Sequence, residues 1–211
     1  GYLTAGDHVL VNPLEHSAVL AVLDKVGARV EYMIVDRYGQ VNVDEVVEQV
    51  QSDTKLVVLM RAHNELGNLY PVQELCQKLS PIPVFCDAVQ ALGKVPVDVE
   101  TLGVAGAVFS AHKVGGLSGV GALWTRRGLD LSPRTRGGSQ ERGERGGTEN
   151  LLGAASFRFA IEQLADRRNA QKRLQTYRDL LVERLSAVKG FTVFGAPTGG
   201  LSNTLLFRVE G

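Results

Sequence analysis

The sequence predicts an α/β fold built on a doubly wound, mostly parallel sheet. Short apolar segments of strand length recur along the first 125 residues, and segments with apolar side chains at helical spacing separate them. A chain of 211 residues is also long enough to bury the core of such a sheet. This alternation is typical of parallel strands joined by helices that cover both faces.

The expected elements of this first part follow in chain order. Val9–Val11 is an apolar run that ends in a turn, and residues 16–26 have helical spacing up to Gly27, which suits a helix end. Further strands are expected at Val30–Val35, Leu56–Met60, Val84–Cys86, Ala107–Ser110 and Gly121–Trp124. Helices are expected at Val43–Val50, with Asn42 as its cap, and at Val72–Leu79.

The pattern changes at Thr148, and we expect a second domain to begin soon after it. Thr148 is expected to cap a helix over residues 149–165, and a longer helix should pass through Leu174, Tyr177, Leu181, Leu185 and Val188. Strands are expected at Phe191–Phe194 and Thr204–Val209. These boundaries predict a large domain over 1–165 and the start of a small α+β domain over 166–211. Both ends of the chain read as incomplete, which predicts a fragment.

Charge and cysteine content exclude several classes of function. Lys and Arg together number 23, as do Asp and Glu, so no net charge favours nucleic acid or an anionic membrane. Arg167, Arg168, Lys172 and Arg173 are interpreted as a solvated helix face. No apolar run is long enough to span a membrane. Cys76 and Cys86 lack metal-ligand spacing and lie in apolar segments, which predicts buried thiols and a cytoplasmic protein without a metal site.

Polar side chains follow the predicted strands, where the ligands of parallel α/β sheets bind. They are His16, Asn64, Asp87, Gln90, Ser110, His112 and Lys113. Each has a structural alternative taken alone, such as a helix cap, a turn former or a surface residue. Because the carboxyl ends of parallel strands meet at one edge, we expect these side chains to converge on one site.

Lys113 suggests the chemistry of that site. A lysine at the end of a buried strand is expected to be buried, and burial favours the neutral amine of a lysine, which can form a Schiff base with pyridoxal phosphate. The alternative is a solvated lysine at a strand end. Ser110 and His112 alternate with Ala111, so as strand residues they would project to one side and share a phosphate group.

The motifs, in order, resemble those of the cysteine desulfurases, which are pyridoxal-phosphate enzymes of the class V aminotransferase family. The resemblance runs from about residue 7 to the end of the chain. It rests on Glu15-His16, His63-Asn64-Glu65-Leu66-Gly67, Asp87-Ala88-Val89-Gln90, Ser110-Ala111-His112-Lys113 and the Gly- and Arg-rich segment 137–150. The fold implied is the large domain of the type I pyridoxal-phosphate enzymes, with part of the small domain.

The resemblance also implies a role for each site residue. Lys113 would carry the cofactor, and His16 would stack on its ring and assist proton transfer. Asp87 would pair with the pyridine nitrogen, while Asn64 and Gln90 would contact the ring oxygen. Ser110 and His112 would hold the phosphate. Thr148 would reach the phosphate of the neighbouring subunit in a homodimer.

The implied reaction removes sulfur from L-cysteine and leaves alanine and an enzyme persulfide. A partner protein of iron–sulfur or thio-cofactor assembly would then accept the sulfur. Two alternatives stay open. One is a selenocysteine lyase or a cysteine or cystine C–S lyase of the same fold, and the other is a non-catalytic dimerisation or scaffold module.

The sequence departs from the family pattern in several places. His63 stands where asparagine is usual, which we expect to tune cofactor binding, and Gly115–Gly119 replaces a stiffer loop. The catalytic cysteine, the substrate-binding arginine and one phosphate loop of the family have no counterpart here. We therefore expect the fragment alone to be inactive.

Overall fold

The computed structural model describes residues 1–164, 168–196 and 198–210. A six-stranded sheet forms the centre of the first part, in the order β2-β1-β3-β4-β5-β6. The strands are β1 (His8–Val11), β2 (Arg29–Tyr32), β3 (Thr54–Val58), β4 (Val84–Asp87), β5 (Gly106–Ser110) and β6 (Gly121–Thr125). The first five are parallel and β6 is antiparallel to β5. The predicted mostly parallel, doubly wound sheet is confirmed.

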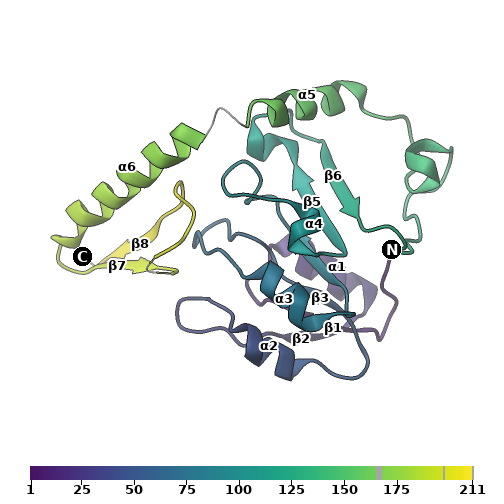
Figure 1. The fold of residues 1–211 in the computed structure, drawn as a ribbon, viewed down its shortest axis with the longest axis horizontal. Helices are drawn as coiled ribbons and strands as arrows, with labels where there is room; N and C mark the ends of the chain where they lie inside the picture. Colours follow the sequence, from purple (N-terminus) through teal and green to yellow (C-terminus); the bar gives the residue numbers. More distant parts are fainter. Residues whose placement is uncertain (165–167, 197, 211) are drawn as a thin grey trace.

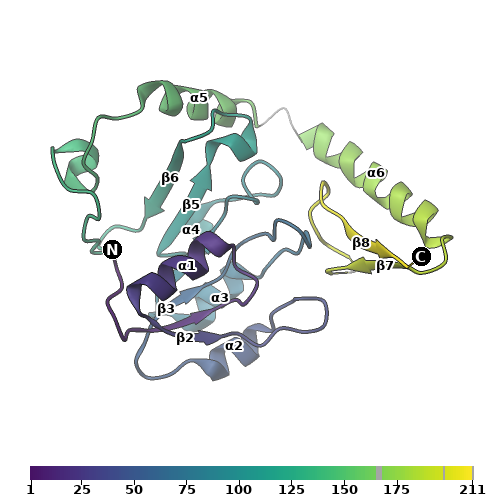
Figure 2. The same ribbon diagram turned by 180° about the vertical axis from the view of Figure 1, so that it is seen from behind.

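Four helices make the crossovers between the parallel strands. They are α1 (Ser17–Val26), α2 (Val43–Gln49), α3 (Val72–Leu79) and α4 (Val99–Leu102). Strands β2 and β3 lie on opposite sides of β1, so the chain first moves one way across the sheet and then the other way. With right-handed crossovers, this places α1 on one face and the other three helices on the opposite face (Figures 1 and 2). The connections after β1 and β3 therefore diverge, and this leaves a crevice at the carboxyl end of the sheet.

Strand β1 shows why the sheet needs both layers of helices. Val9 and Val11 are fully buried and pack with Leu23 of α1. Leu10, between them, is buried in the larger cluster on the other face, together with Val46 of α2 and Leu75 of α3. Successive side chains of a strand point to opposite faces, so a strand that is apolar throughout is stable only when both faces are covered.

The structure corrects the predicted bounds of three strands. Strand β2 ends at Tyr32, and the Met33 N–H makes a last bond to β1, at the Val11 carbonyl at 2.9 Å. On the outer edge, the Ile34 N–H donates to the side-chain oxygen of Gln49 at 3.0 Å. Strand β3 spans Thr54–Val58 and not Leu56–Met60, because the Met60 N–H donates to the Glu15 carboxyl group at 2.5 Å. In β3 a distant side chain thus takes the place of β1 as the acceptor. Strand β8 begins at Leu206, two residues after the predicted start at Thr204.

The predicted helix ends are confirmed in the first part of the chain and corrected in the second. Gly27 ends α1 in the left-handed conformation, with φ of 74°, and the Asn42 side chain accepts from the Asp44 N–H at 2.9 Å. Helix α5 spans Leu151–Glu162, and Asn150, not Thr148, caps it by accepting from the Gly153 N–H at 2.9 Å. Residue 165, the predicted helix end, lies outside the described residues.

The C-terminal part forms a separate α–β–β unit beside the sheet (Figure 1). It consists of α6 (Arg168–Ser186) and the antiparallel strands β7 (Phe191–Phe194) and β8 (Leu206–Val209). Lys172 and Arg173 are exposed, as predicted. Arg167, the side chain of Arg168 and the predicted boundary between residues 165 and 166 lie outside the described residues. No helix in the described ranges is both long and apolar enough to cross a membrane.

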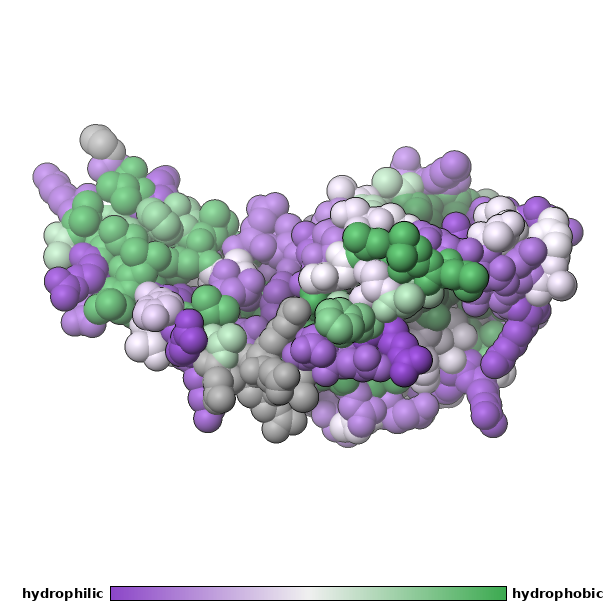
Figure 3. Space-filling view, turned by 90° about the horizontal axis from the view of Figure 1, so that it is seen from above, coloured by the Kyte–Doolittle hydropathy of each residue, from purple (hydrophilic) through white to green (hydrophobic). Residues whose placement is uncertain are grey.

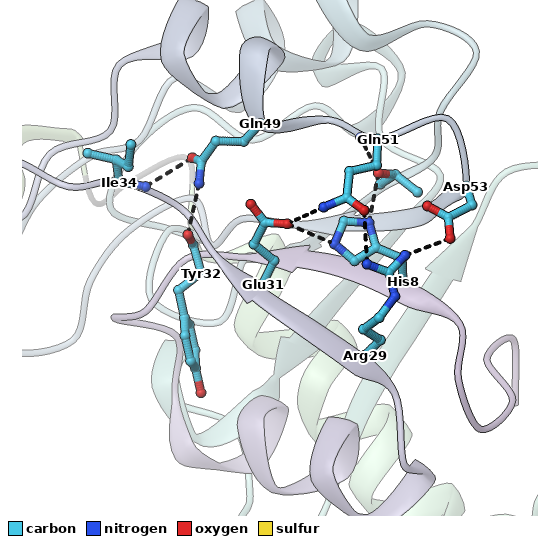
Figure 4. Close-up of polar contacts among 9 residues, drawn as sticks. His8, Arg29, Glu31, Tyr32, Ile34, Gln49, Gln51 and Asp53 are labelled. Carbon is cyan, nitrogen blue, oxygen red and sulfur yellow. Dashed lines mark hydrogen bonds and ion pairs between the residues drawn. The ribbon is translucent and has the colours of Figure 1, made fainter.

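A polar cluster joins the amino ends of β1, β2 and β3, opposite the crevice (Figure 4). His8 is 1% exposed, and its Nδ1 lies 2.9 Å from the Thr54 hydroxyl while its Nε2 lies 3.3 Å from the Glu31 carboxylate. Gln51 donates to Glu31 at 2.6 Å and accepts from Arg29 at 2.9 Å. The cluster therefore holds three strand starts in register, far along the strands from the predicted site.

Candidate active site

A cavity of about 760 Å³ lies against the sheet and reaches the carboxyl ends of its parallel strands. The structure brings together at this cavity every predicted site residue except Thr148, namely His16, Asn64, Asp87, Gln90, Ser110, His112 and Lys113. They come from the connections after β1, β3, β4 and β5. The rest of the lining is largely apolar and includes Val22, Phe85 and Leu123. The cavity thus combines a polar edge with an apolar floor.

Thr148 does not reach the cavity of its own chain. It is exposed on the segment before α5, and Asn150 takes the capping position predicted for it. Its predicted contact with the phosphate of a neighbouring subunit stays a prediction.

His16 lies at the junction of β1 and α1 and has two functions available to it. It is the N-cap residue of α1, and its Nδ1 accepts from the Ala18 N–H at 3.2 Å. The capping alternative considered from the sequence is therefore real. An accepting Nδ1 carries no proton, so Nε2 is the atom of the neutral ring that holds one. His16 is exposed and lines the cavity, where its ring is accessible to a ligand.

Asp87 ends β4 at the bottom of the polar edge. Its carboxylate accepts from the Val89 N–H at 2.9 Å. Burial raises the pKa of Asp87, while the Val89 hydrogen bond and the nearby His16 oppose the shift. Burial disfavours the charged form, so a cationic N–H group entering the cavity would stabilise the carboxylate. This position fits a protonated ring nitrogen.

Lys113 is exposed at the cavity, which corrects the expectation that it would be buried. The chain turns into the 3₁₀ helix η1 (Ala111–Val114) directly after β5. In such a turn residues three apart share a face, so Ala111 and Val114 are buried while His112 and Lys113 point outward. The lysine is accessible to a carbonyl ligand in the cavity.

Ser110 and His112 are close together, although not for the reason predicted. They do not alternate along a strand, because β5 ends at Ser110 and η1 begins at Ala111. The turn nevertheless places the Ser110 hydroxyl oxygen 2.8 Å from the His112 Nδ1. A hydroxyl group beside an imidazole offers hydrogen-bond donors to an anionic oxygen.

Lys94 bonds to the site residue Gln90, and sequence reasoning assigned it no role. Its Nζ donates to the side-chain oxygen of Gln90. Because an ammonium group can only donate, the Gln90 oxygen is engaged and its NH₂ group is the one left for the cavity. Burial lowers the pKa of Lys94, and the charge of Lys113 adds to this. The signal in the sequence was the spacing of four residues between Gln90 and Lys94.

Glu15 is the second residue that sequence reasoning left without a role. It precedes His16, is 5% exposed, and accepts from the Met60 N–H through Oε1. Burial raises the pKa of Glu15 to about 8, and the charge of Asp87 adds to this. Glu15 is therefore neutral at pH 7 and ties the His16 loop to the end of β3. Spacing could not reveal this contact, since 45 residues separate its partners.

Comparison with known proteins places these residues in context. The family model "Aminotransferase class-V" matches residues 1–211. The chain is 37% identical over 211 residues to a cysteine desulfurase IscS of Methanosarcina thermophila, covering 97% of this chain and 52% of that protein. It is 38% identical over 218 residues to a cysteine desulfurase IscS of Dictyoglomus turgidum, covering 99% and 55%. The chain thus spans about half the length of the curated relatives it matches.

Solved structures show the same fold. A NifS-like protein superimposes with a TM-score of 0.89 at 35% identity, covering 96% of this chain and 57% of that one. SspA in complex with cysteine superimposes with a TM-score of 0.84 at 27% identity, covering 97% and 59%. The central sheet and its flanking helices are therefore those of the type I pyridoxal-phosphate fold.

Proposed function

The chain belongs to the class-V aminotransferase family, and from this premise we propose that it supplies the pyridoxal-phosphate site of a cysteine desulfurase. Enzymes of this family generally depend on pyridoxal phosphate. The observation that carries the proposal is the convergence of His16, Asp87 and Lys113, from three separate strand connections, on one cavity. Each offers a group that this cofactor requires.

The residues at the cavity fit the chemical groups of the cofactor. The aldehyde needs a primary amine, which Lys113 offers from an exposed position. The pyridine nitrogen needs an acid partner, and the Asp87 carboxyl group lacks one strong enough to offset its burial. The phenolic oxygen needs a donor, and the NH₂ of Gln90 is available for it. The phosphate needs a hydrogen-bond donor, and the bonded pair of Ser110 and His112 keeps one O–H or N–H free for it.

In this proposal Asp87 keeps the ring nitrogen protonated, and Asn64 and Gln90 hold the ring oxygen. Pyridoxal phosphate, when bound, draws electrons from the substrate carbon attached to it. The His16 ring would stack on the cofactor, and its Nε2 would hold or give up a proton there. Lys113 would hold the cofactor covalently through its amine, which is exposed at the cavity.

The sulfur acceptor is proposed to lie outside these residues. Cys76 is buried on α3 and Cys86 is buried within β4. Burial raises the pKa of Cys76 to about 11 and raises that of Cys86 further. Thiols attack sulfur as thiolates, so both are poor nucleophiles. A cysteine elsewhere in the whole protein would accept the sulfur of L-cysteine as a persulfide and leave alanine, and a partner of iron–sulfur or thio-cofactor assembly would then take that sulfur.

We also propose a homodimer that forms through α5. This helix exposes large apolar side chains, with Leu151 76%, Leu152 73% and Phe159 65% exposed. Figure 3 shows hydrophobic residues gathered on the molecular face that includes α5. A second subunit packed there would bring the neighbouring segment with Thr148 toward the other chain. We further propose that the unit of α6, β7 and β8 begins the small domain. The two cysteines are free thiols, and this favours a reducing, cytoplasmic setting for the protein.

The activity is tested on the full-length protein, loaded with pyridoxal phosphate and supplied with L-cysteine and a thiol reductant. Alanine and sulfide should form in equal amounts, and His16→Ala should slow both while the protein still binds the cofactor. Release of pyruvate and ammonia in place of alanine would identify a C–S lyase and overturn the desulfurase assignment.

A further inference from the structure

His63 holds the loop that presents Asn64 to the cavity. Residues 62–69 form a hairpin-like loop that is closed by a bridge between Ala62 and Leu69 and by a bond from the His63 N–H to the Asn68 carbonyl at 2.9 Å. The His63 side chain turns back inside the loop and is only 8% exposed. Its Nδ1 accepts from the backbone N–H groups of Glu65 and Leu66, each at 3.0 Å.

These two bonds fix the protonation state of the ring. One Nδ1 lone pair shared by two N–H donors leaves no room for a proton, so the neutral ring carries its proton on Nε2. A protonated ring would place a third N–H group against two others and break both bonds. Burial lowers the pKa of His63, although the Glu65 carboxylate and the Leu14 backbone oppose the shift. Glu65 is the charged side chain that faces the ring within the described residues.

The other side of the loop is fixed by the C-terminal unit. The Leu201 N–H donates to the Gly67 carbonyl at 2.7 Å, and the Ala196 N–H donates to the Asn68 side chain at 2.7 Å. The loop tip is thus bonded from outside, while His63 supplies the hydrogen-bond acceptor from inside. Asn64 lies on this tip and lines the cavity.

We propose that His63 is a positioning residue, which holds Asn64 in its cavity-facing place through the two Nδ1 bonds and does so only while its ring is neutral. Histidine at residue 63 thus supplies an acceptor for two backbone N–H groups, and this acceptor can be protonated. The oxygen of an asparagine side chain accepts the same backbone N–H groups in an Asx turn but does not titrate. Cofactor binding in this chain should therefore weaken in acid, through a residue that does not touch the cofactor.

The test compares the wild-type chain with His63→Asn and His63→Leu. Pyridoxal phosphate is titrated at pH 8.0 and pH 5.0, and its dissociation constant is measured from visible absorption. Wild type and His63→Asn should bind equally at pH 8.0. At pH 5.0 the wild type should bind about tenfold more weakly than His63→Asn, as expected for the net loss of one or two buried hydrogen bonds. His63→Leu should bind weakly at both values, by about the same factor.

Protection of the Leu66 amide from hydrogen exchange, measured without cofactor, gives a second readout. It should fall between pH 8.0 and pH 5.0 in the wild type, after correction for the intrinsic rate, and stay constant in His63→Asn. Equal pH profiles for wild type and His63→Asn in both measurements would overturn the proposal. It rests on the proposed cofactor site, and a wild-type chain that binds no cofactor at pH 8.0 would refute that site, while Leu66 protection would still decide the role of His63.

Discussion

The buried carboxyl group of Glu15 makes the stability of the protein depend on pH in a direction opposite to most carboxylates. Glu15 is 5% exposed, and its Oε2 has no hydrogen-bond partner in the described residues. Its pKa rises from an ordinary value of 4.5 to about 8, mainly because of burial. The folded state therefore keeps a proton that the unfolded state releases above pH 4.5.

The sign and the size of the effect follow from proton linkage. Between the two pKa values the folded state binds more protons, so the free energy of unfolding falls as pH rises. Each pKa unit corresponds to about 1.4 kcal/mol. Between pH 5 and pH 8 the contribution of Glu15 should therefore fall by about 3 kcal/mol, a large share of the stability of an ordinary domain.

The substitution Glu15→Gln isolates this contribution. Glutamine has the same shape, its oxygen can still accept from the Met60 N–H, and it has no proton to lose. Urea unfolding at pH 5, 6, 7 and 8 should show the variant gaining about 3 kcal/mol relative to the wild type across the series. Titrating groups that do not interact with Glu15, such as His63, are present in both proteins and cancel in the comparison.

The control is Glu48→Gln, because Glu48 is exposed on α2. Its pH dependence should match that of the wild type. Parallel stability curves for wild type and Glu15→Gln would refute the reasoning, since they would mean that Glu15 titrates alike in the folded and unfolded states.

Three further predictions concern the cap of α5, the cofactor site and the dimer. Asn150→Ala should lower the free energy of unfolding in urea by about 1 kcal/mol, whereas Thr148→Ala should change it by less than about 0.5 kcal/mol; the reverse order would return the cap to Thr148. Asp87→Asn should weaken pyridoxal phosphate binding by about tenfold or more in an absorption titration, because the amide cannot hold the ring nitrogen protonated, and unchanged affinity would contradict this role. Phe159→Asp should shift the molecular mass measured by light scattering from dimer to monomer, while Glu162→Gln on the same helix should not; a wild-type monomer would contradict the interface on α5.

The arrangement of the site was predictable because it depends on local patterns that the fold then combines. Apolar runs marked the parallel strands, and His16, Asn64 and Asp87 stood at their ends. Parallel strands bring such positions to one edge whatever the details of the loops. The structure places all seven of the residues expected to converge at one cavity, whereas the contact of Thr148 with a neighbouring subunit stays a prediction.

The sequence predictions were wrong where the structure depends on a contact between distant residues, or where two neighbouring residues could do the same thing. Glu15 ends β3 by taking the Met60 N–H, and nothing near Met60 in the sequence shows this. Thr148 and Asn150 are both residue types that often cap helices. Since α5 begins at Leu151, Asn150 is the residue directly before it and bonds to its first turn. Lys113 was expected to be buried because it follows a buried strand, but a single 3₁₀ turn places it outside.

The departure at His63 shows how the structure sharpens a sequence observation. The substitution of histidine for asparagine suggested that cofactor binding would be tuned, without indicating how. The bonds from two backbone N–H groups to Nδ1 show that histidine preserves the acceptor that the loop requires. A proton on Nδ1 would remove that acceptor, which is the basis of the proposed loss of cofactor binding in acid.

The central claim is that Lys113 carries pyridoxal phosphate, and chemical trapping tests it most directly. The purified chain is incubated with the cofactor, reduced with borohydride and digested, and the modified peptides are identified by mass. The account predicts one phosphopyridoxyl group, on Lys113, and none in Lys113→Arg. Modification of the neighbouring Lys94 in preference to Lys113, or random labelling of surface lysines, would contradict it.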